Sequence, residues 1–205
     1  MWKRVAAVIV VVIAFAGIAI ARLDGANTLN AYEWMDYGTV ITTDGQVIRY
    51  DGDGKAIDWL NDHVSGSPVI AEAIVILPRS YGGAYACGGA RISRSTGLPT
   101  VMGWDRHEAQ QRPTTDFQQR ERDIYDLYTS TNIANKRRVI DTYQIEYIVS
   151  GPLELIYPTT DGYNHCTSSG SAAGIAALSA MVGTDLEIVF SEDGTTVYHV
   201  QPSTE

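Results

Sequence analysis

The apolar stretch VIAEAIVIL (Val69–Leu77) lies between Pro68 and Pro78 and is rich in β-branched residues. A continuous apolar run of this length, closed by two prolines, is typical of a strand buried on both faces in an α/β sheet. Glu72 is the exception, because a carboxylate in a buried strand is costly unless it is paired. Two interpretations stay open. Glu72 is either a ligand-binding carboxylate at the carboxyl end of a strand or a structural partner for an arginine such as Arg91.

On both sides of this strand, helical and extended patterns alternate along the chain. Helices are expected at 55–64, 120–130 and 171–181, with one more starting from Asn132 or Asn135 as its cap. Further strands are expected at 98–104 and 145–151. The Asp193-Gly194 pair predicts the turn of a closing hairpin over 186–200. This order predicts a three-layer-like α/β domain with mostly parallel central strands and a C-terminal β-hairpin.

The N-terminus carries an uninterrupted apolar run, Val5–Ala21, that as a helix would span roughly 25 Å. It predicts a single membrane helix, with a signal peptide cut before Arg22 as the alternative. Lys3 and Arg4 favour a cytoplasmic N-terminus under the positive-inside bias. We therefore expect an anchor over residues 1–22 in the cell membrane and an extracytoplasmic α/β domain over residues 23–205.

The chain has a formal net charge of −9, and every acidic residue follows the apolar run. This balance argues against nucleic acid as a partner, because nucleic-acid binding requires a basic face. The two cysteines, Cys87 and Cys166, are expected either to form a disulfide in an oxidising compartment or to be unrelated free thiols. Two cysteines so far apart make no metal-ligand pattern, and the sequence predicts neither a metal site nor a cofactor.

A polar segment, STGLPTVMGWDRHEAQQR (Ser95–Arg112), carries the densest group of candidate functional side chains. His107 and Glu108 do not continue into a zinc-protease H-E-x-x-H motif, because the fourth position after His107 is Gln111. No G-x-S-x-G serine nucleophile elbow is present either. His107 is therefore left as a possible acid or base or as a helix cap, and no residue is assigned as catalytic.

Four blocks of the chain carry a family resemblance: GSPVIAEA, GGARISRSTGLPTVMGWDRHEAQQR, RERDIYDLY and YQIEYIVSGPLELIYP. In this order and spacing they resemble the YYY membrane proteins, which are similar to the glycosyltransferase C superfamily of lipid-linked-sugar transferases. The resemblance covers roughly residues 27–200. It implies the last membrane helix and the extracytoplasmic domain of a polytopic protein. It also implies that the chain is not catalytic alone, because the family's catalytic acid lies on a membrane loop that is absent here.

The resemblance also implies a ligand-binding collar. Arg91 and Arg112 would hold a phosphate or carboxylate, and Trp104 would stack on a sugar ring. The whole set is Glu72, Arg91, Ser93, Trp104, His107, Glu108, Gln111 and Arg112. The alternative is a buried polar network that fixes the loop.

The expected function is substrate binding or assembly beside a polytopic membrane protein, with a lipid-phosphate sugar or a glycan as the ligand. A non-catalytic structural or interaction subunit of a membrane or cell-surface complex is the second hypothesis. A free-standing enzyme that uses His107 or Glu108 is the third, so the sequence leaves enzymatic activity undecided.

Overall fold

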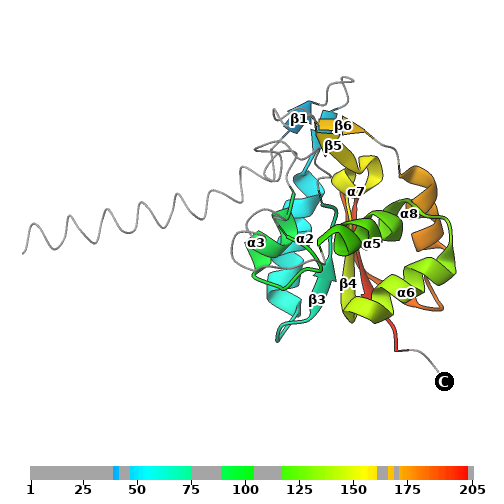
Figure 1. The fold of residues 1–205 in the computed structure, drawn as a ribbon. Coiled ribbons are helices and arrows are strands. Elements are labelled where there is room, and N and C mark those ends of the chain that lie inside the picture. The colour runs from blue at the N-terminus through cyan, green and yellow to red at the C-terminus, as the bar shows by residue number, and fades with distance from the viewer. Residues whose placement is uncertain are drawn as a thin grey trace, which may run out of the picture.

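The computed structural model describes residues 39–41, 47–74, 89–103, 117–160, 166–168 and 171–202, which form a mixed α/β domain (Figure 1). Its main sheet has the strand order β3-β4-β8-β7. These strands are Val69–Ala71, Ile145–Ser150, Thr195–Val200 and Leu186–Glu192. β3 and β4 are parallel, whereas β4–β8 and β8–β7 are antiparallel. The predicted C-terminal β-hairpin is confirmed, but the mostly parallel centre is wrong, because the sheet is mixed.

The sheet is covered on both faces. Successive residues of a strand point to opposite faces, and here they enter two separate cores. Ile70, Val149 and Val197 belong to one core, and the adjacent residues Ala71, Ile148 and Tyr198 belong to the other.

The first core is closed by α2 (Asp51–His63) and α3 (Arg91–Thr96). The second core is closed by α5 (Phe117–Thr129), α6 (Ile133–Tyr143) and α8 (Ala172–Ser179). Figure 1 shows these two sets of helices on opposite sides of the sheet. The described part of the chain therefore has the three layers that the sequence predicts.

Most of the expected helices form, and one of them starts early. Of the two predicted caps, Asn132 is the one that caps α6, because its Oδ1 accepts a hydrogen bond from the Asn135 backbone N–H at 3.3 Å. α2 begins at Asp51, ahead of the expected Lys55. Residues 51–54 form its first helical turn. Asp51 and Asp53 suit that place because carboxylates are favourable near a helix N-terminus.

The extended segments are shorter than expected. β3 ends at Ala71, and residues 75–88 lie outside the described residues. The strand expected over 98–104 is reduced to a single bridge between Thr100 and Ile70. A short helix that was not expected, α7 (Pro152–Ile156), follows β4 directly.

Two small antiparallel pairs lie at the end of the domain where α7 begins (Figure 1). They are β1 (Thr39–Ile41) with β2 (Val47–Arg49), and β5 (Pro158–Thr160) with β6 (Cys166–Ser168).

Of the helices that the structure describes, none is both long and apolar enough to span a membrane. The expected anchor over residues 1–22 lies outside the described residues. The anchor and its signal-peptide alternative both stay predictions.

Candidate functional site

The carboxyl ends of β3 and β4 meet at one edge of the sheet, because the two strands are parallel. The chain continues from β3 into Glu72 and from β4 into Gly151 and α7. β8 runs antiparallel to β4, so its first residue, Thr195, lies at the same edge. Open α/β sheets place their ligands at such an edge, and here it holds a cluster of buried charges.

Arg91 is the cation of this cluster and is fully buried. Its Nε donates to Oδ2 of Asp53 at 2.5 Å. Its two terminal nitrogens donate to the two carboxylate oxygens of Glu154 at 3.1 and 2.7 Å. The guanidinium also lies 5.8 Å from the centre of the Tyr50 ring. The contact with Glu154 is bidentate: two N–H donors of the planar guanidinium match the two oxygens of the carboxylate.

The carboxylates that hold Arg91 are themselves held by other groups. Glu154 accepts hydrogen bonds from the backbone N–H groups of Ala73 and Gly151, at 2.7 and 2.8 Å. Asp53 accepts one from the hydroxyl of Thr195 at 2.8 Å. The network therefore joins the segment after β3, the segment after β4, the first turn of α2 and the start of β8.

Glu72 does not pair directly with Arg91 but caps the helix that Arg91 begins. Its two carboxylate oxygens accept from the backbone N–H groups of Ile92 and Ser93, at 2.8 and 2.9 Å. These are N–H groups of the first turn of α3, which have no partner inside the helix. Glu72 is fully buried, and these two hydrogen bonds account for its tolerance in the core.

The electrostatics of the cluster are unbalanced, with three buried carboxyl groups around one guanidinium. Burial raises the pKa of Asp53 and of Glu72, and the positive charge of Arg91 offsets only part of that rise. Burial acts the same way on Glu154, but there Arg91 and the hydrogen bonds outweigh it and lower the pKa. Burial alone would lower the pKa of Arg91, but its two carboxylate partners raise the pKa well above the ordinary value. Arg91 thus stays charged between its two carboxylate partners, whereas burial makes the charged forms of Asp53 and Glu72 less favourable.

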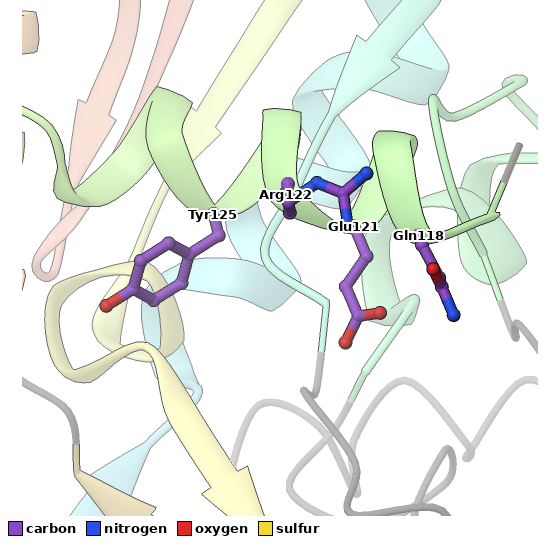
Figure 2. A pocket seen from close by; sticks show the side chains of 4 residues that line it. All are labelled: Gln118, Glu121, Arg122 and Tyr125. Carbon is purple, nitrogen blue, oxygen red and sulfur yellow. The ribbon is translucent and has the colours of Figure 1, made fainter.

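A hollow of about 350 Å³ lies along α5, on the other side of the sheet. Its described lining consists of Gln118, Glu121, Arg122 and Tyr125. Figure 2 shows Tyr125, Glu121 and Gln118 leaving the same side of α5, with the guanidinium of Arg122 alongside the helix. Residues three, four and seven apart share one face of an α-helix, which is why these four side chains line one hollow.

Tyr125 is half-buried, and a second aromatic ring sets its orientation. It meets the ring of Tyr157 edge to face, with 5.3 Å between centroids and an interplanar angle of 86°. Tyr157 is completely buried just after α7. Beside them, Arg122 donates to the amide oxygen of Gln119 at 3.1 Å. The hollow therefore combines one aromatic face with one carboxylate, one guanidinium and one amide, and these groups suit a small polar ligand.

The structure brings three of the predicted site residues together, namely Glu72, Arg91 and Ser93. Trp104, His107, Glu108, Gln111 and Arg112 lie outside the described residues, so the collar as a whole stays a prediction. The disulfide also stays a prediction, because Cys87 lies outside the described residues too. Among the described residues, no group of three or more His, Cys, Asp or Glu side chains is placed to hold a metal ion.

Sequence reasoning missed Asp53, Glu154 and Thr195, and it did not single out the four residues of the α5 hollow. A signal for Glu154 was present, because GPLE directly after a predicted strand places a glutamate at the third position of a helix with proline first. The spacing of residues 118, 121, 122 and 125 was a signal for the hollow. Asp53 and Thr195 had no such signal, because they meet 142 positions apart.

Comparisons with known proteins give a loose structural likeness. No family model matches the chain, and neither does any curated protein. Among solved structures, the chain is similar to the C-terminal globular domain of an oligosaccharyltransferase from Archaeoglobus fulgidus. The TM-score is 0.42 and the sequence identity 10%, over 72% of this chain and 95% of that chain. A likeness at this level assigns no function, and membership of the YYY family is not confirmed.

Proposed function

We propose that this chain is a membrane-anchored domain exposed outside the cytoplasm that binds a lipid-phosphate sugar or glycan for a polytopic glycosyltransferase. It is not catalytic alone in this proposal, and its partner supplies the reacting groups. The proposal rests on the sequence resemblance to the YYY membrane proteins over residues 27–200, together with the arrangement around Arg91.

One observation carries the proposal. Arg91 and Ser93, which open the longest block of that resemblance, are fixed by Asp53, Glu72 and Glu154 at the sheet edge where α/β proteins hold ligands. Because these contacts fix Arg91 and Ser93, the start of the block is already in position before a ligand binds. Such preorganisation lowers the free-energy cost of binding. The predicted ligand contacts, Trp104 and Arg112, follow in the same block.

Binding to a lipid-phosphate sugar tests this function. The full chain in lipid nanodiscs should bind a polyprenyl-phosphate hexose, and Arg112→Ala should weaken that binding by about tenfold or more, because a charge-assisted contact to phosphate is lost. The melting temperature should stay unchanged. Arg94→Ala is the matched control, since Arg94 is an exposed arginine on α3, and it should bind as the native chain does. No binding by the native chain would contradict the proposal.

A second candidate function is a structural or interaction subunit of a membrane or cell-surface complex. It is favoured by the complete burial of Arg91, whose guanidinium already holds two carboxylates. Under this alternative, Arg112→Ala would lower the melting temperature, and neither the native chain nor the variant would bind the lipid-phosphate sugar. Copurification with an identified multi-helix glycosyltransferase would decide for the first function, and copurification with other envelope proteins would decide for the second.

A further inference from the structure

The hollow on α5 has no part in the function proposed above, and its chemistry points to a ligand of its own. We propose that it binds the ring of a neutral hexose, with Tyr125 as the stacking platform and Gln118, Glu121 and Arg122 as hydrogen-bond partners. The site lies along α5, on the face of the sheet opposite to α3, which Arg91 begins.

The first support is the aromatic ring. Tyr125 is half-buried, so part of the ring is accessible, and its edge-to-face contact with the buried Tyr157 holds it in place. An aromatic face that is already ordered binds the apolar side of a sugar ring without the cost of immobilising a free side chain. Its large apolar surface contributes most of the contact energy expected from a hollow of this size.

The second support is the set of polar groups beside the ring. A carboxylate accepts hydrogen bonds, a guanidinium donates them and a primary amide does both. Together they match vicinal hydroxyl groups, each of which is a donor and an acceptor. Figure 2 shows Glu121 between Tyr125 and Gln118 along the helix, so acceptors and donors lie beside the platform and not across from it.

The charge of the described lining suits a neutral ligand. Glu121 and Arg122 contribute one negative and one positive charge, so the described lining has no net charge to attract a phosphate or a carboxylate. The negative charge of Glu121 also reaches Tyr157, where it adds to burial in raising the pKa of that phenol. Figure 2 shows Glu121 on the same side of α5 as Tyr125.

The volume sets the size of the ligand. At about 350 Å³ the hollow is at the small end of the range of ligand sites, roughly 300–1,000 Å³. A single sugar residue suits it better than a long glycan. We expect an affinity in the millimolar range, because one ring and a few exposed hydrogen bonds make a weak site.

Saturation-transfer NMR on the full chain in lipid nanodiscs tests the site, with free glucose, mannose, galactose and N-acetylglucosamine as probes. Nanodiscs are needed because detergents with sugar head groups would compete. At least one of these sugars should receive saturation, and Tyr125→Leu should weaken its binding by about tenfold. Tyr125→Phe, which keeps the ring, should bind within about threefold of the native chain. Glu121→Gln should weaken binding by about threefold to tenfold, because a charged acceptor is replaced by a neutral one.

The control is Tyr147→Leu, which removes a half-buried tyrosine on the face of the sheet covered by α2. It should leave sugar binding unchanged, and a melting curve of each variant checks that the fold is intact. The proposal is overturned if no sugar binds the native chain at tens-of-millimolar concentration, if Tyr147→Leu loses binding as Tyr125→Leu does, or if a hexose phosphate binds better than the neutral hexose. The free sugars carry no lipid and no phosphate, so failure here leaves the lipid-phosphate proposal standing, and the reverse also holds.

Discussion

One buried side chain, Arg91, interacts with three buried carboxyl groups. It contacts Asp53 and Glu154 directly, and its charge also acts on Glu72. A buried ion pair adds little compared with well-packed apolar groups, because its attraction is offset by the loss of hydration. Removing only the cation has a different effect, since it leaves several carboxyl groups in the core without a counter-charge.

Replacing this arginine should therefore be severe. We expect Arg91→Met to lower the free energy of unfolding by about 3–5 kcal/mol, the usual cost of breaking one side of a buried pair. Urea denaturation at neutral pH measures it. Arg94→Met, three residues further along α3 and exposed, is the matched control and should stay within about 0.5 kcal/mol of the native chain. An equal loss in both variants would show that α3 itself, and not the buried pair, is sensitive.

Single residues were the hardest feature to read from the sequence. The cost of burying Glu72 correctly predicted that it needs partners, but the partners are backbone N–H groups and not Arg91, the structural partner named in one of the two interpretations. The carboxylates that do hold Arg91 stand 38 and 63 positions away from it. Such pairs depend on which strand ends meet in space, and one sequence does not contain that information.

At the scale of elements, α5 and α6 are joined by an unusual contact. Lys136 of α6 is fully buried, and its Nζ donates to the backbone carbonyl of Leu127 near the end of α5. Carbonyl groups in the last turn of a helix lack partners within it, so a lysine there acts as a cap. Burial lowers the pKa of Lys136 to about 8, and the negative charge of Asp126 opposes that shift only in part.

This pKa predicts how stability changes with pH. Between pH 8 and 10.5 the unfolded chain holds a proton on Lys136 that the folded chain has released, so stability rises with pH. From pH 7 to 9.5 the rise from this group should be about 2 kcal/mol. Urea denaturation across that range should show the rise in the native chain and not in Lys136→Met.

That experiment needs an upper limit on pH and a control variant. Measurements should stop below pH 10, because burial raises the pKa of Tyr128 well above its ordinary value and its ionisation on unfolding then acts the other way. Lys55→Met changes an exposed lysine of α2 and should keep the rise. If the rise survives in Lys136→Met, it comes from another group.

Helices were predicted better than strands, for a physical reason. α5 and α6 bury one stripe each, and that stripe repeats in the sequence with the helical period. β3 was overestimated because an apolar run shows that residues are buried but not that they pair. Ala73 and Ile74 are buried without being in a strand.

The whole molecule differs from its prediction in how the strands are ordered. The expected layers are present, but β8, the last of the strands that the structure describes, lies between β4 and β7 and makes the sheet mixed. A hairpin is recognisable locally from Asp193-Gly194, and both residues do have the positive φ of its turn, 45° and 82°. Which strand of the hairpin contacts β4 is decided by the packing of the whole domain.

The proposed topology of the full chain leads to a prediction at this scale. The full chain should sediment with membranes and resist carbonate extraction, whereas residues 23–205 alone should not, because Val5–Ala21 is the apolar segment of membrane length. A phosphatase that works only outside the cytoplasm, fused after Glu205, should be active. An inactive phosphatase fusion together with an active cytoplasmic reporter would contradict the proposed orientation. Release of the full chain by carbonate would contradict the proposed membrane anchor.

The Arg91 cluster also determines when the domain can complete its folding during synthesis. A growing chain releases Asp53 and Arg91 first, Glu154 much later and Thr195 last of the four. Until β8 has been synthesised, Asp53 lacks its hydroxyl partner and α2 lacks the strand that closes its core. Contacts that join such distant positions form slowly. The apolar face of α2 therefore stays exposed until β8 has been synthesised. We expect a chain interrupted before Thr195 to be bound by chaperones or degraded by proteases.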